Sequence, residues 1–195
     1  MKLLLSTNNA HKVDEIKAII GDMFDEIVSL KEAGISLEVE ENGDTFEENA
    51  ALKAVAAAKL SGCAALADDS GLCVDCLGGA PGVHSARYAG DQHNDDDNNK
   101  KLIETLKNYP KPHNARFVSV VVIAYPDGRL ITARGEAEGV IVDDSKGQAG
   151  FGYDPYFFYP PAGMTFAQMK PEEKNKVSHR WHALKELRRL LEENK

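Results

Sequence analysis

The stretch KLLLSTNNAHKVDEIKAII, residues 2–20, decides the class of fold. Its apolar beginning, residues 2–6, is typical of a short buried strand. The polar residues 7–9 then supply side chains that can cap a helix. Beyond them, apolar residues recur at helical spacing on one face: Val13, Ile16, Ile19 and Ile20. A strand that leads into an amphipathic helix indicates an α/β fold.

The rest of the chain continues to mix helices with strands. Thr45 and Glu48 have the spacing of a capping box and begin an alanine-rich helix that we expect to reach about Leu60, with Gly62 as its stop. Residues 63–67 and 72–77 are predicted as two short strands; Asp68 and Asp69 follow the first of them and precede a flexible turn.

The second half of the chain adds two helices and a pair of strands. The polar residues 91–99 introduce a helix through Leu106, and a last amphipathic helix begins at Ser178. Two β-rich runs, 117–125 and 130–138, are joined by the turn signal Pro126-Asp127-Gly128. Repeats and low-complexity linkers are absent from the sequence.

Composition limits the class of protein. The 195 residues suit one domain, or one domain with two lobes, and the net charge of −8 argues against a nucleic-acid partner. Three cysteines, and no apolar run of the length of a signal peptide or a membrane span, favour a protein of the cytoplasm without a membrane partner. Cys73 and Cys76 have C-x-x-C spacing, but we interpret them as small buried strand residues because a zinc site needs a second pair of ligands.

Residues 7–12, Thr-Asn-Asn-Ala-His-Lys, combine a strand end, a helix N-terminus and a lysine. Backbone N–H groups and the helix dipole attract anions there, and Lys12 adds a full positive charge. The pattern indicates a phosphate site, although it lacks the glycines of a P-loop. An ordinary helix cap with a lysine in solvent is the alternative.

Asp68 and Asp69 follow a predicted buried strand and precede Ser70-Gly71. Carboxylate oxygens are the ligands that Mg²⁺ prefers, and a carboxylate beside the metal can orient or deprotonate an attacking water. The acidic segment 38–43 offers a further metal carboxylate. The alternatives are an Asp-rich turn that bonds to its own backbone and a solvated loop.

Two later segments carry groups that suit a nucleotide. In residues 150–157, glycines allow close approach of the backbone to a ligand, and aromatic rings can stack on a purine; core aromatics at a sheet edge are the alternative. In residues 170–180, Lys174 and Arg180 can neutralise phosphates or donate to a purine oxygen, and His179 and Arg180 lie in a first helical turn, where the dipole disfavours cations.

Taken in order, these motifs resemble the inosine triphosphate pyrophosphatase family, whose bacterial members are called dITP/XTP or noncanonical purine NTP pyrophosphatases. The resemblance spans nearly the whole chain, and six motifs in register make it specific. The matching stretches are residues 7–12, 43–50, 67–72, 78–82 with 85–88, 150–155, and 173–174 with 178–180.

The resemblance implies a two-lobed α/β protein with a long mixed sheet, a nucleotide cleft between the lobes, and a homodimer. It implies Asp69 as the catalytic acidic residue and a Mg²⁺ ligand, and Glu41 as a second metal residue, with the adjacent Glu40 as the alternative. The positions that match substrate contacts of the family are Thr7, Asn8, Asn9, Ala10, His11, Lys12, Ser70, Phe151, Gly152, Tyr153, Asp154, Lys174, His179 and Arg180.

The implied activity is hydrolysis of noncanonical purine nucleoside triphosphates to the monophosphate and pyrophosphate. A pyrophosphatase for pyrimidine or modified nucleotides and a nonenzymatic nucleotide-binding regulator are the competing hypotheses. Departures from the family pattern are Ser6, Asn8 and the unusually acidic stretch 91–97, which we expect to be a loop without effect on a catalytic residue.

Overall fold

The computed structural model describes residues 1–7 and 9–193. The chain forms two compact units: the first comprises Met1–Asp69, Ser119–Gly135 and Arg180–Lys195, and the second comprises Ser70–Val118 and Glu136–His179. Its helices are α1 (Ala10–Ile20), α2 (Phe46–Ser61), α3 (Asp95–Leu106), α4 (Pro171–Lys174) and α5 (His179–Glu193). Its strands are β1 (Lys2–Leu5), β2 (Glu26–Ser29), β3 (Ala64–Val74), β4 (His113–Ala124), β5 (Leu130–Ile141), β6 (Phe157–Tyr159) and β7 (Met164–Thr165).

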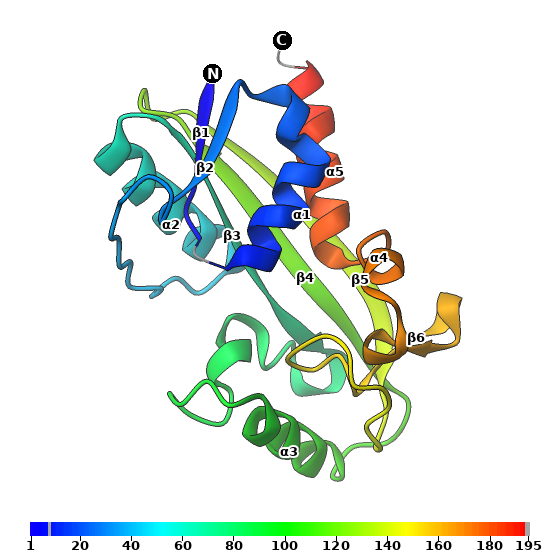
Figure 1. Ribbon diagram of the computed structural model, residues 1–195. Coiled ribbons are helices and arrows are strands. Elements are labelled where there is room, and N and C mark those ends of the chain that lie inside the picture. The colour runs from blue at the N-terminus through cyan, green and yellow to red at the C-terminus, as the bar shows by residue number, and fades with distance from the viewer. Residues whose placement is uncertain (8, 194–195) are drawn as a thin grey trace. The chain divides into compact units, whose positions relative to one another are not determined.

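The strands form one seven-stranded sheet in the order β2-β1-β3-β4-β5-β6-β7 (Figure 1). Strand β1 is parallel to both β2 and β3, whereas β6 is antiparallel to β5 and β7. Parallel neighbours require crossover connections, which α1 and α2 provide. The predicted α/β class with a mixed sheet is therefore confirmed.

The core of the first unit lies between its strands and the helices α1 and α5, which run side by side in Figure 1. The periodic apolar face predicted for α1 is present, since Ile16 and Ile20 are fully buried. Leu184 and Leu187 of α5 belong to the same cluster. This packing fixes the position of the first turns of both helices, which carry Lys12 and Arg180.

Helix α2 begins and ends where its sequence signals predict. The Thr45 hydroxyl oxygen accepts a hydrogen bond from the Glu48 N–H at 3.1 Å, and the Glu48 carboxylate accepts one from the Thr45 N–H at 3.2 Å. Gly62 ends the helix in the left-handed conformation, with φ of 67°. The capping box and the glycine stop are therefore confirmed.

The second unit has its own core, built on Leu72, Leu102, Phe117, Phe157 and Phe166. Helix α3 covers part of this core through Leu102 and Leu106, so the predicted helix is confirmed. The short strands β2, β6 and β7 were not predicted: β6 and β7 have only two or three residues, and β2 lacks the continuous apolar run that marks β1.

One prediction about β3 is wrong: no flexible turn follows Asp68 and Asp69 to divide two short strands. Strand β3 runs without interruption from Ala64 to Val74, and both Asp68 and Asp69 are buried within it. The polar residues stay in the strand because ion pairs compensate both carboxylates. The predicted 72–77 strand accordingly ends at Val74, and residues 75–77 form a 3₁₀ turn.

Candidate active site

Asp68 and Asp69 lie side by side on β3 and point in opposite directions. Successive side chains of a strand face opposite sides of the sheet. Asp68 shares its side with Ala64 and Leu66, which pack toward α1 and α5, and it contacts residues of those two helices. Asp69 faces the other side and contacts Lys53 of α2. The adjacent carboxylates therefore belong to different environments.

Asp68 is surrounded by cations. The Lys12 Nζ lies 2.8 Å from one carboxylate oxygen and 2.9 Å from the other, and the Arg180 Nε lies 3.4 Å away. The Arg180 guanidinium also binds Glu15 at 2.8 Å. Burial alone would raise the pKa of Asp68, but the Lys12 and Arg180 charges outweigh it and hold that pKa well below its usual range. Asp68 is thus ionised, and it ties β3 to α1 and α5.

Asp68→Asn is expected to lower the free energy of unfolding by about 3 kcal/mol or more, because it leaves two cations without their buried partner. Since the folded pKa lies below the unfolded one, the stabilisation is present at neutral pH and is lost as the pH falls below about 4. Urea unfolding at several pH values measures it. The exposed Asp14→Asn serves as the control, and equal losses in the two variants at pH 7 would contradict the prediction.

Asp69 shares one cation with Glu41. The Lys53 Nζ lies 2.9 Å from the Glu41 carboxylate and 3.4 Å from that of Asp69. Burial raises the pKa of Asp69; the Lys53 charge opposes this shift and Glu41 adds to it, so that the pKa lies above its ordinary value. Burial alone would lower the pKa of Lys53, but Asp69 and Glu41 raise it. The lysine is thus a permanent cation at this pair of carboxylates.

The donor set fits Mg²⁺ in a limited way. The Asp69 Oδ2 is buried and meets no hydrogen-bond donor among the described residues. Glu41 shares Lys53 with Asp69 and so offers a second carboxylate beside it, whereas its role as a metal residue in preference to Glu40 stays a prediction. In residues 1–7 and 9–193, no three His, Cys, Asp or Glu side chains form a ready metal cage. Magnesium usually takes one or two carboxylates and completes its shell with waters and phosphates, so two carboxylates with one uncommitted oxygen suit it.

Lys53 is the residue of this group that sequence reasoning missed. It lies on α2 four residues after Asn49, so the two side chains share one helix face. Asn49 is buried although it is polar, and its side-chain oxygen accepts a hydrogen bond from the Gly43 N–H at 2.8 Å. The sequence did contain a signal for Lys53: it and Asn49 are polar residues spaced four apart on the buried face of an alanine-rich helix.

The N-terminal motif lies at the start of α1, as its capping pattern predicts. The Thr7 hydroxyl oxygen accepts a hydrogen bond from the Asn9 N–H at 3.2 Å, and the Asn9 side-chain oxygen accepts one from the Lys12 N–H at 3.3 Å. Asn8 lies outside the described residues. Ala10 and His11 form the first turn of α1. The structure brings Lys12 to Asp68, and the phosphate role of the motif stays a prediction.

The loop Gly150–Asp154 belongs to the second unit and closes on itself. The Asp154 carboxylate is buried, accepts a hydrogen bond from the Phe151 N–H at 3.0 Å, and pairs with Lys174. A Cβ on Gly150 would collide with this carboxylate, and the φ of Gly150 is +79°, so both space and backbone require glycine. The Phe151 ring is 56% exposed, with the Lys174 Nζ 4.8 Å from its centre. The loop thus presents an aromatic face.

His179 and Arg180 are neighbours in α5 but have different surroundings. The His179 ring is buried and stacks on Phe117, with 4.9 Å between the ring centres. Arg180 is buried in the ion pairs with Asp68 and Glu15 described above. Ser70 lies on β3, directly after Asp69. The two basic residues predicted in the first turn of α5 therefore have separate environments. The His179 ring packs against Phe117 of the second unit, and the Arg180 guanidinium is bound by ion pairs in the first unit.

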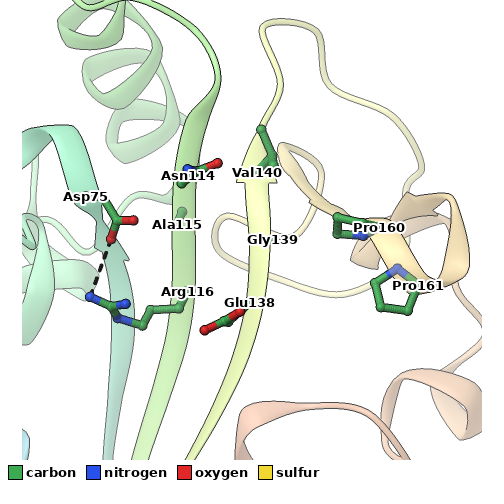
Figure 2. A pocket seen from close by; sticks show the side chains of 9 residues that line it. All are labelled: Asp75, Asn114, Ala115, Arg116, Glu138, Gly139, Val140, Pro160 and Pro161. Atoms are coloured by element: carbon green, nitrogen blue, oxygen red, sulfur yellow. Dashed lines mark ion pairs between the residues drawn. The ribbon is translucent and has the colours of Figure 1, made fainter.

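A hollow elsewhere in the second unit holds none of the predicted site residues. It has a volume of about 460 Å³ and opens over β4 and β5, with Pro160 and Pro161 at its rim (Figure 2). Its Arg116 pairs with Asp75 at 3.4 Å and with Glu136 at 3.9 Å. Among the described residues no helix is long and apolar enough to cross a membrane. Cys73 and Cys76 form no disulfide and are half-buried; Cys73 lies in β3, but Cys76 lies in the 3₁₀ turn rather than in a strand as predicted.

Comparison with known proteins places these features in a family. The Ham1 family profile matches residues 3–190. A protein of Desulforamulus reducens named dITP/XTP pyrophosphatase is 50% identical over 192 residues, covering 98% of this chain and 96% of that protein. One of Clostridium perfringens with the same name is 49% identical over 194 residues, covering 96% and 95%.

A solved structure agrees with the sequence comparison. The Staphylococcus aureus Ham1 protein superposes with a TM-score of 0.92 at 40% identity, and the match covers the whole of both chains. The family resemblance inferred from the motifs is therefore confirmed over nearly the entire sequence. With its mixed seven-stranded sheet and its paired aspartates on β3, this chain belongs to the Ham1 family.

Proposed function

We propose that this protein hydrolyses noncanonical purine nucleoside triphosphates, namely ITP, dITP and XTP, to the monophosphate and pyrophosphate, and so removes them from the nucleotide pool. The names of the relatives support the reaction. The observation that carries it in this chain is the Asp69 carboxylate, which is buried, shares Lys53 with Glu41 and keeps Oδ2 without a donor among the described residues. A buried carboxylate with a raised pKa and an uncommitted oxygen is suited to accept a proton from water.

The first unit supplies the groups for the phosphates. Lys12 lies at the N-terminal turn of α1, where backbone N–H groups favour anions. Its pairing with Asp68 fixes its ammonium group, so the lysine is oriented before substrate arrives. Lys53 adds a second half-buried cation beside Asp69. Bound Mg²⁺, held by Glu41 and Asp69, would supply further charge compensation for the phosphate oxygens.

The chemical step follows from these positions. Water attacks the α-phosphorus, its proton passes to the Asp69 carboxylate, and the bond from that phosphorus to the bridging oxygen of the β-phosphate breaks. Pyrophosphate leaves with the bridging oxygen. The chain contributes mainly orientation and fixed charge, as is general for phosphoryl chemistry.

The second unit supplies groups for the base. The exposed Phe151 ring on a closed loop can stack on a purine, and stacking tolerates any base. Discrimination therefore requires polar groups, for which we propose His179, Arg180 and the backbone of residues 151–154. Hydrogen-bond donors aimed at the purine 6-oxygen pair with that oxygen in inosine and xanthosine. In adenosine they meet the 6-amino group, which is itself a donor.

A panel of nucleoside triphosphates, assayed for pyrophosphate and for orthophosphate, tests the proposed function. We expect pyrophosphate from ITP, dITP and XTP, with little product from ATP, GTP and the pyrimidine nucleotides. Release of orthophosphate instead of pyrophosphate would contradict the proposed cleavage site. Binding of ITP without any product would show a nucleotide-binding regulator.

Metal dependence is expected to be strict. Glu41 and Asp69 are hard oxygen ligands, so activity should vanish after exhaustive chelation and return with Mg²⁺, with Mn²⁺ as a substitute. Glu41→Gln should raise the Mg²⁺ concentration needed for half-maximal activity, whereas the adjacent, exposed Glu40→Gln should leave it unchanged. Full activity in a metal-free sample would exclude the metal role.

A further inference from the structure

The loop Gly150–Asp154 is held to helix α3 at a single residue, Gly152. The Gly152 N–H donates to the Asp95 carboxylate at 2.7 Å, and the Gly152 carbonyl accepts from the Asn99 side-chain amide at 2.9 Å. Asp95 and Asn99 are four residues apart on α3, so their side chains lie on one helix face. One helix therefore binds both backbone polar groups of one loop residue.

Gly152 is the residue at which the loop most needs such support. Its φ is +61°, a conformation that other residues rarely adopt, and nothing lies within 4 Å of the place where a Cβ would stand. Glycine is thus required for the backbone conformation rather than for space. Because glycine is flexible, hydrogen bonds must select this conformation: the Asp154 N–H donates to the Phe151 carbonyl at 3.3 Å across the turn, and α3 binds Gly152 itself.

Other bonds hold the residues on either side of Gly152. The Tyr153 hydroxyl donates to the Ser85 carbonyl at 2.7 Å, and the Asp154 carboxylate accepts from the Phe151 N–H. We call the two hydrogen bonds from Asp95 and Asn99 to Gly152 the clamp. Asn99 is buried and Asp95 is exposed, so the clamp joins an interior amide to a surface carboxylate. With the backbone fixed in this way, the exposed Phe151 ring is the part of the loop that is presented to solvent.

We propose that Asp95 and Asn99 are positioning residues for purine binding: by clamping Gly152 they fix the Phe151 ring in the orientation that a base stacks on. The inference rests on the proposed function, because it takes the loop as the base-binding element. It assigns a role to Asp95 of the acidic stretch 91–97; that stretch was expected to be a loop, but its last three residues form the first turn of α3. Asp95 and Asn99 act through the loop and touch no reacting atom.

Three variants and one control test the clamp. Asp95→Ala removes the acceptor and Asn99→Asp removes the donor, whereas Asp95→Asn keeps an oxygen that can accept the Gly152 N–H. The control is Asp96→Ala, which removes the same charge from the same first turn of α3 and so changes the helix dipole equally. Each variant is compared for KM and kcat with ITP, and for the dissociation constant of inosine monophosphate.

Asp95→Ala and Asn99→Asp should each raise KM and the inosine monophosphate dissociation constant about tenfold, with kcat little changed, as expected for lost positioning of a binding group. Asp95→Asn should restore most of the affinity, and Asp96→Ala should behave as the unmodified protein. Amide hydrogen exchange of Gly152, followed by NMR, should be faster in Asp95→Ala than in Asp96→Ala.

The outcomes separate this inference from the proposed function. If the unmodified protein binds inosine monophosphate but releases no pyrophosphate from ITP, the proposed function fails and the binding constants of the variants still decide the clamp. Equal affinities in Asp95→Ala and Asp96→Ala would overturn the clamp, even with faster exchange at Gly152. If the unmodified protein turns over ITP without measurable binding of inosine monophosphate, the proposed function stands and the KM values of the variants decide the clamp.

Discussion

Asp69→Asn is expected to lower kcat for ITP by about 10²-fold or more, the scale of a lost general base or metal-orienting group. The amide keeps the size of the side chain but can neither accept the proton of the attacking water nor offer Mg²⁺ a charged oxygen. The Lys53–Glu41 pair remains in place, so the site keeps a compensated carboxylate. Pyrophosphate release under saturating ITP and Mg²⁺ measures the effect.

The pH dependence gives this prediction a second readout. Because burial raises the pKa of Asp69 in the metal-free protein, protons should compete with Mg²⁺ for this carboxylate, and at limiting Mg²⁺ the activity should show an acid limb above the ordinary range of an aspartate. The acid limb should disappear from the residual activity of Asp69→Asn. Near-normal kcat in a folded Asp69→Asn protein would remove Asp69 from the mechanism.

Stability separates the two neighbouring aspartates. Asp68 has a lowered pKa and Asp69 a raised one, so ionised Asp68 stabilises the fold at neutral pH whereas ionised Asp69 opposes it. Asp69→Asn should therefore change the free energy of unfolding less than Asp68→Asn does. The reverse order in urea unfolding would show that the roles assigned to the two faces of β3 are wrong.

ITP and XTP are expected to exceed ATP and GTP by a wide margin in kcat/KM. Each buried donor that is left without a partner costs about 1–3 kcal/mol, or roughly 5- to 150-fold, so two or three such contacts account for strong rejection of ATP. Guanosine shares the 6-oxygen, and its rejection must come from crowding or missing partners at the 2-amino group. Comparable kcat/KM for ITP and ATP would refute base reading, even with pyrophosphate as the product.

Variants can divide base reading from stacking. Phe151→Ala should weaken the binding of ITP and of ATP alike, because stacking does not depend on the base. His179→Phe keeps an aromatic ring against Phe117 but removes the ring nitrogens, so it should weaken ITP much more than ATP.

Arg180→Ala should also weaken ITP more than ATP. Because Arg180 binds Asp68 and Glu15, that variant loses stability as well and is the less direct test. If the ratio of kcat/KM for ITP to that for ATP is unchanged in both His179→Phe and folded Arg180→Ala, other residues select the base.

The elements with strong local signals were predictable from the sequence. The strand and helix of residues 2–20, the capping box of α2 and the turn that joins β4 to β5 each depend on neighbouring residues alone. The family motifs added the candidate site residues, because their order along the chain is itself specific. The short strands β2, β6 and β7 lack such a signal, since their stability comes from the partner strand.

The tertiary structure decided how the acidic residues are used. By itself, the sequence Asp68-Asp69-Ser70-Gly71 favours a turn, because polar residues and glycine disfavour strands when no cation compensates the carboxylate charges. Lys12, Lys53 and Arg180 come from three helices and supply that compensation, so the strand continues and its alternation separates the two carboxylates. Charge compensation across distant segments depends on three-dimensional distance, which local sequence patterns do not contain.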